Sequence, residues 1–105
     1  MYNNYIVFFN FHKIYWVIYL KVIKIEEYNS NMGKLICVDP KELYLQHHIV
    51  GSINIPYETL LYNRDRILNK EETYYIYCHG GHKSKRAVNV LEIYGFKVVQ
   101  VIVNK

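Results

Sequence analysis

The stretch that decides the fold is Tyr74 to Ser84, "YYIYCHGGHKS", in which a short apolar strand delivers a cysteine to a cationic, glycine-containing loop that opens a helix. A thiol placed at a helix N-terminus, among backbone N–H groups and cations, ionises readily, and the thiolate is the nucleophilic form of cysteine. The sequence therefore predicts that Cys78 is a catalytic nucleophile rather than an inert buried side chain.

The loop after Cys78 is expected to form a cradle for an anion. Gly80 and Gly81 allow the chain to wrap so that several N–H groups point at the sulfur. We expect Ser84 to act as the N-cap of the helix that follows. The whole loop, His79 to Ser84, is therefore predicted to bind a negatively charged substrate. Positive potential would come from the basic side chains His79, His82, Lys83, Lys85 and Arg86.

Size and composition limit the possible classes of protein. A chain of 105 residues with 51% hydrophobic and 21% charged residues is globular and holds one main core. The net charge is +4 and the pI is about 9.0, but the lysines are scattered. We therefore predict a small anionic substrate and no nucleic-acid partner. Two cysteines form neither a disulfide framework nor a zinc-site spacing, which predicts a reducing cytoplasm, no metal and no cofactor.

The pattern of elements predicts an α/β fold with a central parallel sheet flanked by helices, because buried apolar strands alternate with helical segments. Ligands of such folds bind at the carboxyl ends of the strands, where Cys78 is expected to lie. Gly95 is expected to be the left-handed residue that ends the helix after the loop. The predicted strands are 21–25, 35–38, 52–55, 74–77 and 96–103, and the predicted helices are 41–46, 57–68 and 84–94.

Residues 1–20 form an apolar N-terminal extension before a domain predicted over 21–105. The run Tyr5 to Leu20, "YIVFFNFHKIYWVIYL", is rich in aromatic and β-branched residues but is interrupted by Asn10, His12 and Lys13. It fits a spanning helix poorly and a secretory signal worse. The interpretations that remain are an extra strand or irregular apolar segment that covers the domain, or an imperfect membrane anchor that faces the cytoplasm.

Residues 35–56, "LICVDPKELYLQHHIVGSINIP", and residues 74–99, "YYIYCHGGHKSKRAVNVLEIYGFKVV", resemble the single-domain rhodaneses, the thiosulfate sulfurtransferase family. The resemblance covers residues 21–103. It implies a three-layer fold and a ping-pong reaction, in which Cys78 takes a sulfane sulfur from thiosulfate or another persulfide donor. The resulting persulfide would then pass that sulfur to a thiophilic acceptor, such as a thiol.

The chain departs from the family pattern at several positions. Where the family carries Asp and Arg in an "LIDVR" strand end, this chain has Cys37 and Asp39, and His79 replaces the usual loop arginine. The helix that normally closes the domain after the last strand is also missing from the pattern before Lys105. These differences motivate an alternative function, a non-catalytic binding or persulfide-carrier module built on the same fold.

Other assignments follow from single positions. A cysteine phosphatase or arsenate reductase needs an arginine six residues after its nucleophile, and Ser84 stands there instead. Cys37 is interpreted as a packing residue, with a resolving thiol that forms a disulfide with Cys78 as the alternative. His48 resembles the family's structural histidine, and neither the pair His47 and His48 nor the loop histidines predict a metal site.

Overall fold

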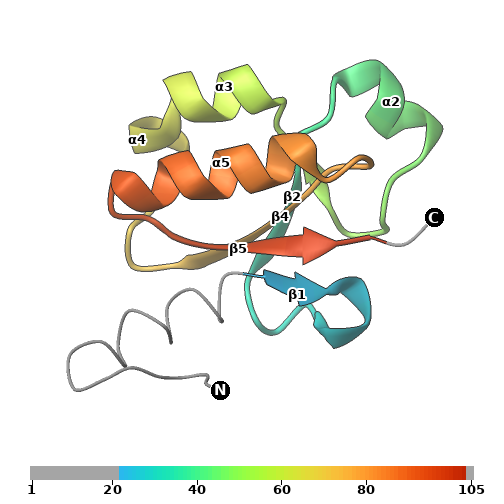
Figure 1. Ribbon diagram of the computed structural model, residues 1–105, viewed down its shortest axis with the longest axis horizontal. Helices are drawn as coiled ribbons and strands as arrows, with labels where there is room; N and C mark the ends of the chain where they lie inside the picture. The colour runs from blue at the N-terminus through green and yellow to red at the C-terminus, as the bar shows by residue number, and fades with distance from the viewer. Residues whose placement is uncertain (1–21, 104–105) are drawn as a thin grey trace.

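The computed structural model describes residues 22–103, which form one five-stranded parallel sheet in the order β1-β5-β4-β2-β3 (Figure 1). β4 is central, and it pairs with β2 on one side and with β5 on the other. The predicted α/β class and parallel sheet are therefore confirmed. The strands are β1 (Val22–Lys24), β2 (Lys34–Cys37), β3 (Ile53–Asn54), β4 (Thr73–Tyr77) and β5 (Lys97–Ile102).

Helices cover the two faces of the sheet unequally. Three of them, α3, α4 and α5, lie together on one side, whereas α2 lies toward the carboxyl ends of the strands on the other (Figure 1). The helices are α2 (Lys41–Gln46), α3 (Tyr57–Tyr62), α4 (Arg64–Ile67) and α5 (His82–Ile93), and a short 3-10 helix, η1 (Ile25–Glu27), follows β1.

The alternation of side chains along the strands divides the core in two. On the α5 face, Ile36 and Ile76 pack against Leu91 of the helix. On the opposite face, Leu35 and Tyr75 belong to a separate buried cluster. Because successive side chains of a strand point to opposite faces, each central strand contributes to both clusters. This explains the unbroken apolar runs in the sequence.

Two predicted elements differ in extent from the observed ones. The helical stretch predicted over 57–68 is interrupted at Asn63, which is both the C-cap of α3 and the N-cap of α4. Its side chain donates a hydrogen bond to the Thr59 carbonyl oxygen at 2.9 Å, so it competes with the continuing helix. The strand predicted over 52–55 is reduced to β3, because Ser52 bonds to Ile49 in the preceding turn instead.

The end of α5 agrees with the expectation for Gly95. Its φ is +93°, and the N–H groups of Gly95 and Phe96 donate to the carbonyls of Glu92 and Leu91, as in a Schellman motif. Tyr94, the last residue of the helix predicted over 84–94, is about half exposed, and the Arg64 guanidinium lies over its ring, 3.5 Å from the ring centre. The helix therefore turns sharply into β5.

The interpretations of residues 1–20 fall outside the described residues. Within 22–103, every helix is too short or too polar to cross a bilayer. β5 is the last element of the described residues, and within residues 22–103 no helix follows it. The expectation of a missing closing helix also concerns residues 104 and 105, which lie outside the described residues.

Leu91→Ala should destabilise the domain by about 2–5 kcal/mol, because the side chain is completely buried against the sheet and its removal leaves a cavity. The matched control is Ile93→Ala on the same helix, which is 81% exposed and should change stability by less than about 0.5 kcal/mol. Urea denaturation followed by circular dichroism measures both. Equal losses would contradict the assignment of the α5 face.

Candidate active site

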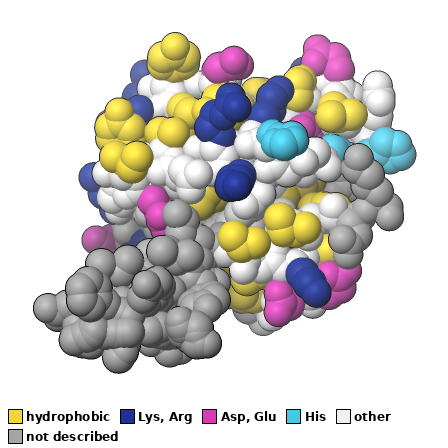
Figure 2. All heavy atoms as spheres, viewed as in Figure 1, with side chains coloured by type: hydrophobic (Ala, Val, Ile, Leu, Met, Phe, Trp, Pro, Cys, Tyr) yellow, Lys and Arg dark blue, Asp and Glu magenta, His cyan; other side chains and the backbone are white. Residues whose placement is uncertain are grey.

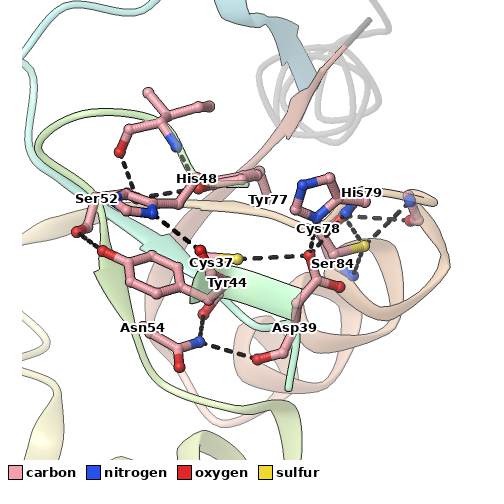
Figure 3. Close-up of polar contacts among 12 residues, drawn as sticks. Cys37, Asp39, Tyr44, His48, Ser52, Asn54, Tyr77, Cys78, His79 and Ser84 are labelled. Atoms are coloured by element: carbon pink, nitrogen blue, oxygen red, sulfur yellow. Dashed lines mark hydrogen bonds and ion pairs between the residues drawn. The ribbon is translucent and has the colours of Figure 1, made fainter. Parts of the chain in front are cut away.

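Cys78 lies immediately after β4, and its sulfur accepts two backbone hydrogen bonds from the chain that follows (Figure 3). The N–H of Gly81 is 3.1 Å from Sγ and the N–H of Ser84 is 3.2 Å away. Both amides stand at the N-terminus of α5, where the partial charge of the helix is positive. The cysteine is only 3% exposed, so these amides act in a site largely shielded from water.

Gly81 makes this arrangement possible. It is the N-cap of α5, and its φ of +84° lies in the left-handed region that residues with a side chain adopt at a cost. The positive φ turns the chain sharply back, so the first turn of the helix closes over the sulfur. Gly80 does not have a positive φ, so only one of the two predicted glycines has this role.

The predicted N-cap role of Ser84 is wrong. The helix begins at His82, two residues earlier than predicted, because Gly81 caps it by its backbone conformation alone. Ser84 is completely buried inside the first turn, where its hydroxyl donates to the Gly81 carbonyl oxygen at 3.2 Å. The Cys78 thiol in turn lies 3.4 Å from the Ser84 Oγ and can donate to it.

Gln100, in the neighbouring strand β5, hydrogen-bonds to the loop after Cys78. This role was not predicted from the sequence. Its buried amide donates to the Gly81 carbonyl oxygen and to the Ser84 Oγ, each at 3.0 Å. The available signal was an uncharged polar residue between valines in the strand "KVVQVI". A buried amide of this kind requires partners, and here the loop provides them.

The remaining predicted loop residues separate into two groups. His82 and Lys83 are exposed in the first turn of α5, together with Lys85 and Arg86. Figure 2 shows lysine and arginine side chains gathered over this part of the surface. Positive potential therefore surrounds the outer edge of the Cys78 loop. Among residues 22–103, no group of three or more acidic, histidine or cysteine side chains could hold a metal ion.

His79 does not line the cradle as the sequence suggested, because it pairs with Asp39 at the end of β2. Asp39 is 4% exposed, and its Oδ2 accepts hydrogen bonds from the His79 backbone N–H at 3.0 Å and from the His79 Nδ1. The Cys37 thiol lies 3.5 Å from the same oxygen. The amide of Asn54 donates to the Asp39 carbonyl oxygen at 2.9 Å and holds the turn in place.

Cys37 and Cys78 lie on opposite faces of the sheet. Cys37 belongs to the core cluster of Leu35 and Tyr77, whereas Cys78 belongs to the cluster packed against α5. Figure 3 shows the two sulfur atoms with separate polar partners. Burial raises the pKa of the Cys37 thiol to about 11, despite a lowering contribution from the Asp39 backbone. The alternative of a resolving thiol is therefore rejected, and Cys37 is a packing residue.

His48 has a scaffold contact, as expected. Its ring stacks on Tyr44 with 4.2 Å between ring centres, and its Nδ1 lies 2.9 Å from the Tyr44 carbonyl oxygen. The Tyr44 hydroxyl donates to the Ser52 carbonyl oxygen at 2.6 Å. These contacts tie the end of α2 to the loop that leads into β3.

Comparison with known families identifies this arrangement. A family model described as a rhodanese-like domain matches residues 24–104, nearly all of the sheet and its helices. The chain belongs to the rhodanese-like domain family. That family includes sulfurtransferases, and it was the family predicted from the sequence.

Solved structures agree with the rhodanese-like assignment. A Staphylococcus aureus rhodanese-like domain protein is 31% identical, with a TM-score of 0.68 over 77% of this chain and 83% of that one. A Staphylococcus saprophyticus protein is 28% identical, with a TM-score of 0.70 over 77% and 85%. The reduced CoADR-RHD protein of Bacillus anthracis is 29% identical, with a TM-score of 0.69 over 79% of this chain, but this chain spans only 15% of its length. No curated protein sequence matches.

Mild oxidation of the folded rhodanese-like domain with diamide should not join Cys37 to Cys78, because the two side chains point away from each other across the sheet. Intact-mass analysis after alkylation measures this directly. The same treatment in denaturant should form the disulfide and serves as the control. An intramolecular disulfide formed without loss of circular dichroism would contradict the placement.

Proposed function

We propose that this protein is a sulfurtransferase that carries a sulfane sulfur as a persulfide on Cys78. The observation that carries the proposal is the pair of backbone N–H groups, from Gly81 and Ser84, that donate to the Cys78 sulfur at the N-terminus of α5. Donors to an anionic sulfur strengthen in a site that excludes water. The same donors serve the thiolate and the persulfide.

The reaction divides into two displacements on sulfur. The Cys78 thiolate attacks the outer sulfur of thiosulfate, or of another persulfide donor, so that a new S–S bond forms and sulfite, or the donor thiolate, leaves with the electron pair. A thiophilic acceptor then attacks the outer sulfur of the Cys78 persulfide and releases the thiolate. Each step conserves charge and electrons, and neither needs a metal or a cofactor.

The charge around the loop supports an anionic donor. The exposed side chains of Lys83, Lys85 and Arg86 surround the start of α5, whose N-terminal backbone amides add positive potential. A small anion is therefore attracted to the mouth of the loop, and we expect a thiol to be the acceptor. A nucleic-acid partner forms no part of the proposal, and a reducing compartment such as the cytoplasm suits a free catalytic thiol.

A second candidate is a rhodanese-like module that holds a persulfide for a partner protein without rapid turnover. One observation favours it. The amide next to the nucleophile, that of His79, donates to the Asp39 carboxylate instead of to the sulfur. A carboxylate at this point also places negative charge close to an anionic nucleophile, which slows attack on a dianion such as thiosulfate.

Incubation with thiosulfate should add the mass of one sulfur atom to Cys78, and a reductant should remove it. Intact-mass spectrometry measures the gain, and peptide mapping assigns it. Cys78→Ala should show no gain, whereas Cys37→Ala, the matched loss of the other cysteine, should still gain one sulfur atom.

Turnover separates the two candidates. Continuous formation of thiocyanate from thiosulfate and cyanide supports the enzyme, whereas a stable persulfide without turnover supports the carrier. A protein that gains no sulfur from thiosulfate or from a low-molecular-weight persulfide contradicts both.

A further inference from the structure

The Ser84 hydroxyl has more acceptors around it than its one hydrogen can serve. Its Oγ lies 3.2 Å from the Gly81 carbonyl oxygen, 3.4 Å from the Cys78 sulfur and 3.0 Å from the Gln100 Nε2. The carbonyl can only accept a hydrogen bond, and the amide nitrogen can only donate one. The hydrogen of the hydroxyl therefore goes either to the Gly81 carbonyl or to the Cys78 sulfur.

The ionisation state of Cys78 decides which of the two acceptors receives this hydrogen. A neutral thiol donates its own proton to the Ser84 Oγ, and the hydroxyl hydrogen then points to the Gly81 carbonyl. A thiolate has no proton to donate, so the contact between sulfur and oxygen is attractive only when the hydroxyl donates to the sulfur. The thiolate then has three donors, the hydroxyl and the backbone amides of Gly81 and Ser84.

The Gly81 carbonyl oxygen keeps its hydrogen bonds when the hydroxyl turns to the sulfur. It also accepts from the Gln100 Nε2 at 3.0 Å and from the Lys85 backbone N–H at 3.2 Å. A carbonyl oxygen has two lone pairs, so these two donors satisfy it without the hydroxyl. Loss of hydrogen bonds from a buried acceptor would oppose the rotation, and Gln100 removes much of that cost.

Gln100 holds one orientation in both states of the hydroxyl. Its Nε2 carries two hydrogens, and the Gly81 carbonyl oxygen and the Ser84 Oγ both accept from it. The side chain is only 6% exposed, and its strand is fixed because Gln100 pairs with β4 on one side and with β1 on the other. The amide therefore leaves the hydroxyl hydrogen as the part of this network that is free to move.

We propose that Ser84 is a catalytic residue whose hydroxyl turns from the Gly81 carbonyl to the Cys78 sulfur as charge forms on that sulfur. Gln100 is the positioning residue that permits the turn. This inference deepens the proposed function and rests on it, because charge forms on the sulfur each time the Cys78 persulfide is discharged.

The hydroxyl acts mainly in the second displacement. When cyanide attacks the outer sulfur of the Cys78 persulfide, a C–S bond forms, the S–S bond breaks, and the bonding pair stays on Sγ. The Ser84 hydroxyl donates to the charge that develops there, and its proton stays on the serine. A donor that engages as charge develops lowers the barrier. In the first displacement the same donor stabilises the attacking thiolate, which makes the thiolate less nucleophilic.

The titratable side chains on the elements around Cys78 differ from Ser84, because within residues 22–103 none of them hydrogen-bonds to the sulfur. They are Asp39 after β2, His79 after β4, Tyr57 and Glu58 on α3, and His82, Lys83, Lys85 and Arg86 on α5. Variants of Ser84 and Gln100 leave all of these groups in place. A change in the reactivity of Cys78 in such variants is therefore assigned to the hydroxyl.

The first test measures the two displacements separately, in single turnover and at an alkaline pH where Cys78 is ionised in every variant. Ser84→Ala keeps the backbone amide and should slow discharge of the persulfide to cyanide about 10-fold, the low end for a hydrogen bond to a charged group. Loading with thiosulfate should be unchanged or faster, because the thiolate has lost a donor. Ser52→Ala, which removes a buried hydroxyl that bonds to Tyr77, is the matched control and should change neither rate.

The second test asks whether Gln100 acts through the hydroxyl. Gln100→Met has a similar size but no donor, and it should also slow discharge without slowing loading. In the Ser84→Ala background it should slow discharge no further, because the group that it positions is already absent. Equal slowing of both displacements in Ser84→Ala, no slowing of discharge, or additive effects of the two substitutions overturns the inference.

Alkylation of the unloaded protein with iodoacetamide tests the hydroxyl without a persulfide. The pH of half-maximal alkylation should rise by about one unit in Ser84→Ala, because the thiolate loses a donor, and should not move in Ser52→Ala. An unchanged midpoint in Ser84→Ala overturns the inference. Wild-type protein that gains no sulfur from thiosulfate or from a low-molecular-weight persulfide overturns the proposed function, whereas the alkylation midpoint still decides whether the hydroxyl donates to the sulfur.

Discussion

The hydrogen bonds from the Gly81 and Ser84 amides to the Cys78 sulfur constrain the geometry of the whole carboxyl edge of the sheet. They require a strand that stops at the sulfur, a helix that starts four residues later, and a left-handed residue between them. β4 is the central strand, so the strand end that carries Cys78 is fixed by pairing with β2 on one side and β5 on the other. Gln100 then couples the loop to β5 and keeps the amides in place.

The polar groups around Cys78 lie on two different faces of the sheet. On the α5 face, Ser84 and Gln100 complete the cradle, and on the α2 face, Asp39 and His79 form a separate pair at the edge of an apolar groove. The backbone of His79 links the two sides, because it directly follows Cys78. The sheet therefore separates the sulfur and its amide donors from the Asp39 and His79 pair.

Much of the fold could be predicted from local patterns. The apolar run before Cys78 and the glycine after α5 identify a buried strand and a helix end without knowledge of tertiary contacts. The start of α5 could not be predicted in the same way, because a serine in the first turn resembles a cap until the φ of Gly81 is known. The Asp39 and His79 pair joins residues 40 positions apart, so only the sheet order brings them together. The role of Gln100 was also hard to predict, because its partners Gly81 and Ser84 are 19 and 16 positions away in the sequence.

The central claim is that backbone amides at the start of α5 hold the charge on the sulfur of Cys78. Amide NMR spectra of the isotope-labelled protein, recorded before and after persulfide formation with thiosulfate, test it most directly. The account predicts that the largest amide proton shifts occur at Gly81 and Ser84, with the same residues unperturbed in Cys78→Ala. Shifts that avoid these two amides, in protein shown by mass to carry the extra sulfur, would contradict it.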